Sequence, residues 1–232
     1  MSRPRIDGHR IDGHRVEGRR VEGPGAGFTD VFASALRGEA CRLLGLPPGV
    51  TPWPLDAWRS PVEGDVALAD QCVGTCVDLG CGPGRLTELL ALRGHVVLGV
   101  DLVPEAVFQT RDRGVAALLR DLFEPLPREG HWQTALLADG NIGIGGDPLT
   151  LLRRVAELLA PHGRAVVDLA PPGTGVLTRQ VWLETDAHRS APFPWAVVGV
   201  EAIWSLAWSA GFGEPRVHRY GQRWYAVLPK GI

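Results

Sequence analysis

The stretch Val77-Asp78-Leu79-Gly80-Cys81-Gly82-Pro83-Gly84 decides the fold of this 232-residue chain. Apolar, β-branched residues end at Leu79 and predict a buried strand, and residues 83–94 predict the helix that follows it. Glycines 80, 82 and 84 let the backbone turn sharply between the two and leave room for a ligand. In an open α/β sheet, ligands bind beyond the carboxyl ends of the strands. The stretch therefore predicts a ligand site at that edge.

The spacing of the three glycines indicates which kind of ligand the turn holds. The pattern is G-x-G-x-G, whereas dinucleotide-binding folds carry G-x-G-x-x-G. Asp78 stands two residues before the first glycine, where its carboxylate would repel a pyrophosphate. A carboxylate there suits a ligand with a cationic group, such as an ammonium or a sulfonium.

The rest of the chain continues the alternation of strands and helices. Alternation at this spacing predicts a parallel sheet with helices on both faces, and a closing hairpin around Gly221 makes the sheet mixed. Between these elements, the segment 171–196 reads as a long irregular connection. Counting the first strand, the predicted sheet has seven strands, the others at 95–102, 115–123, 132–140, 163–172, 214–220 and 223–230, with helices at 103–114, 149–160 and 197–212.

Three regions of different character divide the chain. Residues 1–24 repeat a glycine-containing five-residue unit and predict a flexible tail. Residues 25–72 predict a small N-terminal helical cap, with an amphipathic helix over 28–46, a connector rich in proline and tryptophan, and a short helix near its end. Residues 73–232 form the predicted α/β domain, which is a Rossmann-like mixed sheet.

Asp101 ends the second predicted strand and Asp121 follows the third. Together with the glycine turn, these acids resemble the motifs of the class I S-adenosylmethionine-dependent methyltransferases of the small-molecule type. The resemblance covers about residues 73–229. It implies that S-adenosylmethionine is the cofactor, that the acid ending the second strand binds its ribose, and that an acid and an apolar residue after the third strand meet its adenine. The implied cofactor-binding residues are Asp78, Gly80, Cys81, Gly82, Gly84, Asp101, Leu102, Asp121 and Leu122.

The fourth strand ends in Asp139 and Asn141, on the side that the resemblance assigns to the methyl acceptor. The run after it lacks the (D/N)-P-P-(Y/F) pattern of many base- and amide-modifying methyltransferases, which argues against nucleic acid and protein glutamine acceptors. Of the seven histidines, His188 lies on the expected side of the sheet, so His188 and Asp139 are the candidate catalytic residues. The candidate acceptor-binding residues are Asn141, Trp53, Trp58, Trp195 and Tyr220.

Composition limits the remaining classes. Hydrophobic residues make up 45 %, charged residues 22 %, and the formal net charge is −2, which gives no electrostatic case for nucleic acid. Without an 18-residue apolar run or an apolar leader, we expect a cytoplasmic protein that does not span a membrane. We expect no bound metal.

The predicted function is methyl transfer to a small molecule, with secondary metabolism as the expected setting, and oxygen, nitrogen and carbon acceptors all stay open. The main alternative is a protein of the same fold that binds S-adenosylmethionine without methyl transfer, as a cyclase, a decarboxylase or a partner protein. An NAD-dependent oxidoreductase and an RNA methyltransferase are further alternatives. The sequence leaves the oligomeric state open.

Overall fold

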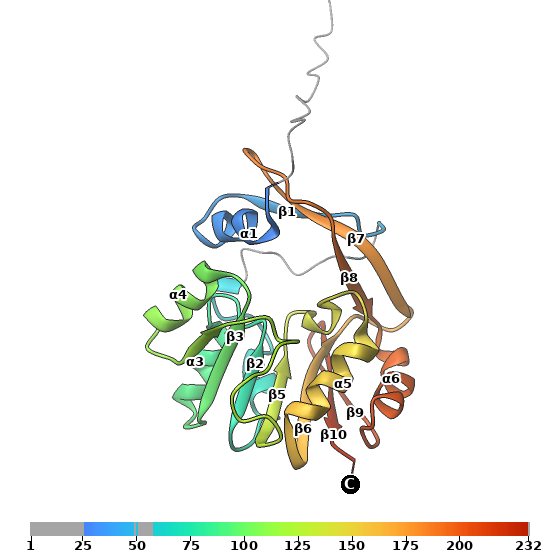
Figure 1. The fold of residues 1–232 in the computed structure, drawn as a ribbon. Helices are drawn as coiled ribbons and strands as arrows, with labels where there is room; N and C mark the ends of the chain where they lie inside the picture. Colours follow the sequence, from blue (N-terminus) through green and yellow to red (C-terminus); the bar gives the residue numbers. More distant parts are fainter. Residues whose placement is uncertain (1–25, 49, 51–57, 232) are drawn as a thin grey trace, which may run out of the picture.

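A seven-stranded sheet forms the centre of the molecule. The computed structural model describes residues 26–48, 50 and 58–231, and its large sheet has the order β4-β3-β2-β5-β6-β10-β9 (Figure 1). The first five strands in this order are parallel, and β10 pairs antiparallel with both β6 and β9. Their bounds are β2 (Cys76–Leu79), β3 (Val97–Asp101), β4 (Ala117–Leu119), β5 (Trp132–Leu137), β6 (Leu159–Leu169), β9 (Arg216–Tyr220) and β10 (Arg223–Pro229). The predicted seven-stranded mixed sheet is confirmed.

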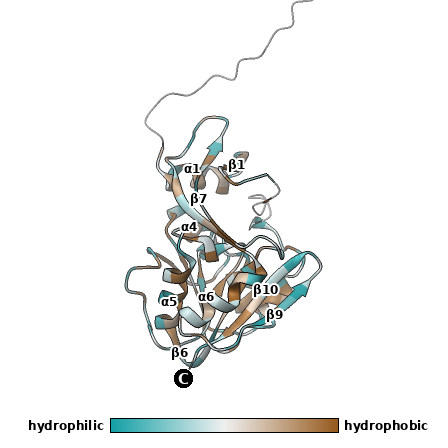
Figure 2. Cartoon of the chain, turned by 90° about the vertical axis from the view of Figure 1, so that its right-hand side faces the viewer, coloured by the Kyte–Doolittle hydropathy of each residue, from teal (hydrophilic) through white to brown (hydrophobic). Residues whose placement is uncertain are grey.

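The burial of a strand follows its position in the sheet. Every residue of β2 is buried, as a central parallel strand covered on both faces should be. At the opposite extreme, β9 is the hydrophilic edge strand of the sheet, with mostly exposed or half-buried residues (Figure 2). Gly221, at a φ of 56°, makes the tight turn that joins β9 to β10.

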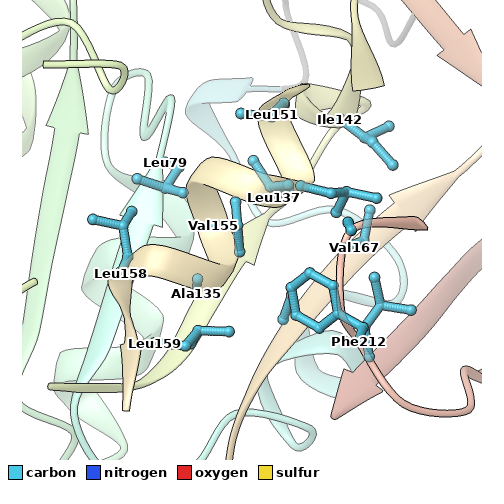
Figure 3. Close-up of a cluster of buried hydrophobic side chains, with 14 of the residues drawn as sticks. Leu79, Ala135, Leu137, Ile142, Leu151, Val155, Leu158, Leu159, Val167 and Phe212 are labelled. Atoms are coloured by element: carbon cyan, nitrogen blue, oxygen red, sulfur yellow. The ribbon is translucent and has the colours of Figure 1, made fainter. Parts of the chain in front are cut away.

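Helices cover both faces of the sheet. One face packs under α5 and α6, where Leu151, Val155 and Leu158 meet Leu137 and neighbouring core residues (Figure 3). On the other face, α2 and α3 pack through a separate apolar cluster. The helices are α2 (Asp65–Ala69), α3 (Arg85–Leu92), α4 (Pro104–Asp112), α5 (Pro148–Leu158) and α6 (Ile203–Ser209), with short 3-10 turns η2 (Asn141–Gly143) and η3 (Val200–Ala202).

The start of α5 shows how local sequence sets an element. The Asp147 carboxylate accepts hydrogen bonds from the backbone N–H groups of Leu149 and Thr150, each at 3.1 Å, and so caps the helix. Pro148 fills the first helical position, where no N–H donor is needed.

The cap differs from the expected helical one. It contains α1 (Phe28–Leu36) together with a three-stranded antiparallel sheet of order β1-β7-β8, formed by β1 (Cys41–Leu44), β7 (Val176–Thr185) and β8 (Phe193–Val198). The predicted helix over 28–46 is too long, because Gly38 at a φ of 109° follows α1 in a left-handed conformation. The prediction that 171–196 is irregular is wrong, since most of this segment is the β7–β8 hairpin.

The cap therefore combines an N-terminal segment with a much later hairpin. Figure 1 shows α1, β1, β7 and β8 above the upper edge of the large sheet. The cap is joined to the main body by packing of α1 on α4, where Phe32 and Leu36 share a buried cluster with Val103 and Ala106. By contrast α2, which falls within the predicted cap region 25–72, packs against the large sheet through Leu68. The predicted tail over 1–24 lies outside the described residues.

The last long helix is also shorter than predicted. Residues 197 and 198 belong to β8, and α6 begins only at Ile203. None of the helices in the described part of the chain has the length and apolarity needed to cross a lipid bilayer.

Candidate active site

A cavity of about 1340 Å³ lies between the carboxyl edge of the large sheet and the cap. Its floor consists of residues at or just after the ends of β2 to β6, and its roof consists of residues from α1, β1, β7 and β8. Twelve of the predicted site residues line it: Trp58, Asp78, Gly80, Cys81, Gly82, Asp101, Leu102, Asp121, Leu122, Asp139, Asn141 and Trp195.

The glycine turn after β2 needs each of its glycines for a different reason. All three have positive φ values, of 74° at Gly80, 53° at Gly82 and 82° at Gly84. A Cβ on Gly82 would meet no atom within 4 Å, and Gly82 lines the cavity, so this residue keeps the floor open. A Cβ on Gly84 would lie 2.6 Å from Thr110 Oγ1, so that residue is required for packing against α4. Gly84 does not line the cavity.

Asp101, at the end of β3, is held in place by the same turn. Its Oδ2 accepts a hydrogen bond from the Gly82 N–H at 2.9 Å, and its Oδ1 accepts one from the Val103 N–H at 2.9 Å. Burial raises the pKa of this carboxyl, and the backbone N–H groups oppose that effect. Each carboxylate oxygen has further accepting capacity, so Asp101 can bind two hydroxyl groups of a ligand.

Asp78 lies beneath the glycine turn. The Thr87 hydroxyl donates a hydrogen bond to its Oδ2 at 2.7 Å. Complete burial raises the pKa of Asp78 to about 7, against the opposing Thr87 hydrogen bond. A cationic ligand in the cavity would favour the ionised form of this carboxyl.

The residues after β4 form one side of the floor. The Asp121 Oδ1 accepts a hydrogen bond from the Phe123 N–H at 3.0 Å, which fixes the turn. Leu122 is buried beside it, and Leu102 is 51 % exposed at the rim. An acid next to an apolar surface can bind the amino group and the ring face of a flat heterocycle.

A buried ion cluster underlies the acceptor side of the floor, and sequence reasoning missed most of it. Asp139 pairs with Arg85 at 2.5 Å and with Arg223 at 3.2 Å. Arg85 also pairs with Asp65, and Arg223 pairs with Asp65 and Asp168. Arg85 offered one signal, since an arginine in the first turn of a helix opposes the helix dipole and calls for an acidic partner.

This cluster commits Asp139 to a structural role. Burial raises the pKa of Asp139, whereas the guanidinium groups of Arg85 and Arg223 lower it. Each of its carboxylate oxygens already accepts a hydrogen bond from one of these arginines. The geometry therefore disfavours Asp139 as a general base.

Asn141 also supports the floor. Its Nδ2 donates hydrogen bonds to the backbone oxygens of Leu79 and Gly80, at 3.0 and 2.8 Å. It therefore anchors the glycine turn to η2, a use of the side chain that the sequence did not suggest. The Cys81 thiol lies 3.7 Å from Thr110 Oγ1, and burial raises its pKa.

Two predicted site residues lie away from the cavity. His188 is exposed at the turn of the β7–β8 hairpin, where its backbone N–H donates a hydrogen bond to Thr185 Oγ1, and it lines a separate small pocket beside α1. Tyr220 is 49 % exposed and does not line the cavity, although its neighbour Gln222 does. Topology placed the loop of His188 on the correct edge, but pairing in the hairpin carries the side chain outward. Trp53 lies outside the described residues.

The floor and the roof together define a class I methyltransferase fold, and the comparisons with known proteins agree. Residues 76–163 match the family model described as "Methyltransferase domain". The chain is 46 % identical over 116 residues to a trans-aconitate 2-methyltransferase of Mycobacterium tuberculosis, covering 49 % of this chain and 40 % of the relative. It is 27 % identical over 154 residues to a 2-heptyl-1-hydroxyquinolin-4(1H)-one methyltransferase of Mycobacteroides abscessus, covering 64 % and 62 %.

A solved structure extends the likeness over most of the fold. The S-adenosylmethionine-dependent methyltransferase from Bacteroides fragilis, in complex with S-adenosyl-L-homocysteine, superposes with a TM-score of 0.72. The match covers 88 % of this chain and 94 % of that one, at 19 % identity. The chain spans 37 % to 62 % of the length of the first curated relatives that it matches. The fold is that of the class I S-adenosylmethionine-dependent methyltransferases, and residues 76–163 match a methyltransferase domain model.

Proposed function

We propose that this protein transfers a methyl group from S-adenosylmethionine to a small-molecule acceptor. One observation carries the proposal: the glycine turn, Asp101 and Asp121 face a single cavity that continues under an apolar roof. The floor suits the donor, and the roofed part leaves room for a second molecule.

The described residues fit the donor. The open face at Gly82 gives the ligand room against the backbone, and Asp101 has free accepting capacity for the ribose hydroxyls. We assign Asp121 and Leu122 to the adenine, and Asp78 to the positively charged amino-acid end. Gly80, Cys81 and Gly84 shape this cradle, and Leu102 forms its rim.

The bound donor supplies an activated methyl group on a sulfonium. In the transfer, a lone pair on the acceptor forms the new bond to the methyl carbon while the carbon–sulfur bond breaks, and that electron pair stays on sulfur. Any proton on the acceptor atom passes to water. The contribution of the protein is to align the two molecules in the chamber, the cavity between the floor and the roof.

The aspartates among the described lining residues are either assigned to the donor (Asp78, Asp101 and Asp121) or held in ion pairs with arginines (Asp139 and Asp168). No histidine, lysine or tyrosine is among the described residues that line it. The exposed position of His188 and the ion pairs of Asp139 argue against both candidate bases. An acceptor that presents its own available lone pair fits this chamber, so a general base is not required.

The printed names of the relatives support a small-molecule acceptor. They include a trans-aconitate methyltransferase, a hydroxyquinolinone methyltransferase and a ubiquinone biosynthesis O-methyltransferase. A natural-product or other secondary-metabolite acceptor fits the aromatic cap. We propose further that the protein acts in the cytoplasm and without nucleic acid, in line with its near-zero net charge.

Two measurements test the function. Calorimetric titration should show binding of S-adenosylhomocysteine and no comparable binding of NAD(H). Incubation with methyl-labelled S-adenosylmethionine and a broad acceptor panel should then label a small molecule. Binding without turnover across the panel would favour the alternative of a cyclase, decarboxylase or partner protein, and preference for NAD(H) would exclude the proposed donor.

A further inference from the structure

Charge is distributed unequally between the floor and the roof of the cavity. All the charged side chains among its described lining residues belong to the floor, at strand ends of the large sheet or at the start of α3. Every described lining residue that α1, β1, β7 and β8 contribute is apolar. They include Phe28, Phe32, Leu43, Leu183, Phe193 and Trp195.

The aromatic side chains of the roof and its side wall form one continuous surface. Phe28 stacks on Phe32 with ring centroids 5.5 Å apart, and it meets Phe193 edge-on at 4.7 Å. The ring centroids of Phe32 and Trp58 lie 5.2 Å apart, and those of Phe193 and Trp195 lie 6.4 Å apart. A surface of this kind favours a flat ring system, which can stack on or pack edge-on against several rings at once.

Among the described residues of the floor, each cationic side chain already has an acidic partner. The two arginines that line the cavity are already paired: Arg85 with Asp65 and Asp139, and Arg120 with Glu124 at 3.8 Å. Five aspartates line the same floor, so carboxylates outnumber guanidinium groups there. A carboxylate brought into this chamber would lose its hydration and meet like charge, which is costly without a cation to pair with.

The volume allows a bulky acceptor. Single small-molecule sites commonly measure ~300–1000 Å³, and the cavity here is larger, at about 1340 Å³. The excess indicates space for the donor and a second molecule together.

From these observations we propose that the acceptor is a bulky, mostly apolar ring compound that carries no carboxylate or other anionic group. The proposal rests on the proposed function, since it describes the acceptor half of the same chamber. It adds a selection rule: the apolar roof and the acidic floor together discriminate against small polycarboxylates.

A matched pair of fluorescent probes tests the selection rule by binding alone. N-phenylnaphthylamine and anilinonaphthalene sulfonate share the same rings and differ by one sulfonate. Each is titrated into the protein with and without saturating S-adenosylhomocysteine. We expect the neutral probe to bind in the chamber at least about tenfold more tightly than the sulfonate, because the sulfonate finds no cation. Equal or tighter binding of the sulfonate, or no binding of either probe, would overturn the proposal.

A pair of variants places the effect in the chamber. Leu177 lines the cavity, whereas Val176 beside it on β7 is 45 % exposed and does not. Leu177→Lys should strengthen sulfonate binding about tenfold or more and weaken binding of the neutral probe. Val176→Lys adds the same charge outside the chamber and should leave both affinities as in the wild type. If both variants behave alike, the chamber does not select by charge.

The readouts keep this proposal separate from the proposed function. Failure to bind S-adenosylhomocysteine, or failure to transfer methyl to any acceptor, contradicts methyl transfer while the probe preference can still be measured. A direct check tests the proposed function and the selection rule together in a panel of ring compounds and their carboxylated analogues. Methyl label should enter the neutral compounds. Equal labelling of the carboxylated analogues would overturn the selection rule.

Discussion

Gly82 and Gly84 are separated by one residue, yet substitution should affect them differently. Both have positive φ values, so alanine adds backbone strain of about 1–2 kcal/mol at either site. At Gly84 the new Cβ would also collide with Thr110, so Gly84→Ala should lower the melting temperature clearly more than Gly82→Ala. Gly82→Ala should instead weaken binding of S-adenosylhomocysteine, because its Cβ projects into open space. Thermal unfolding and calorimetry on both variants check this, and equal melting temperatures would contradict it.

Asp101→Ala should weaken the binding of S-adenosylhomocysteine by roughly 1.5–3 kcal/mol, the usual contribution of hydrogen bonds to a charged group. The variant loses both the ribose contact that we propose and the acceptor that orients the Gly82 N–H. Calorimetric titration measures the loss. Glu214→Ala, at a site outside the cavity lining, is the control and should bind as the wild type does. Unchanged affinity in Asp101→Ala would remove this residue from the donor site.

If Asp78 meets the cationic end of the donor as we propose, donor binding should depend on pH. Its pKa is raised by burial to about 7, so the carboxyl is largely neutral below that pH and ionised above it. The ionised form attracts the cationic donor, so affinity for S-adenosylmethionine should rise as pH increases through about 7. Asp78→Asn should bind more weakly at high pH and lose this dependence. Calorimetry about one pH unit on either side of 7 gives the comparison, and an unchanged slope in the variant would assign the dependence to another group.

The same shift has the opposite sign for folding. A carboxyl whose pKa in the folded protein lies above its unfolded value of 3.8 stabilises the folded state at pH values below 3.8. This contribution is lost as pH rises through about 7. The apoprotein therefore gives up some stability to keep a carboxyl ready for its ligand.

At the scale of elements, the connection into β7 is held by one side chain. The Glu201 carboxylate accepts hydrogen bonds from the N–H groups of Gly173 and Gly175, at 3.1 and 2.7 Å. These bonds lower the pKa of Glu201. Glu201→Ala should speed amide hydrogen exchange at both glycines and in the following turns of the roof, while the core strand β2 stays protected. Exchange measured by mass spectrometry decides it, and unchanged rates would show that the roof holds this connection by itself.

The roof elements also show where sequence reasoning reached its limit. In β7, inward and outward residues alternate in burial only from Val181 onward, so half of the strand carries no period-two pattern. The β1 strand is short and finds its partner in β7, far along the chain. Local pattern therefore extended α1 through β1, and only long-range pairing determines the correct boundary.

The strands of the main sheet, by contrast, could be predicted along the chain, although their spatial order and register could not. Each of its parallel strands ends in a short apolar run followed by a turn residue, and each following helix has a clear stripe or cap. Asp101 and Asp121 could be placed at strand ends for this reason. The hydrogen bonds of Asn141 could not, because they depend on how η2 meets the glycine turn.

Across the whole molecule, the buried ion cluster connects distant parts of the sequence. Arg223 in β10 pairs with Asp65 at the start of α2, and Asp168 at the end of β6 completes the contact. Local sequence patterns do not predict contacts between residues so far apart along the chain, so most of the cluster was not predicted. Its members come from the starts of α2 and α3 and from the ends of strands in the large sheet, and together they hold the floor.

Removing one partner from this cluster should be strongly destabilising. Arg223→Met leaves the buried Asp168 without its cation and should lower the free energy of unfolding by about 3–5 kcal/mol. Arg93→Met removes a more exposed pair with Asp70 and should cost at most about 1 kcal/mol. Denaturant unfolding of both variants measures the difference. Similar losses would mean that the cluster contributes little net stability.

The cap is assembled from two stretches, one that precedes the main body along the chain and one inserted between β6 and α6. The strands that carry the donor-side acids run beneath without contributing to either stretch. Chimeras that exchange both stretches for those of a relative should therefore inherit its acceptor while keeping their own donor affinity. Exchange of the cap should therefore change the acceptor while the donor-side strands stay the same.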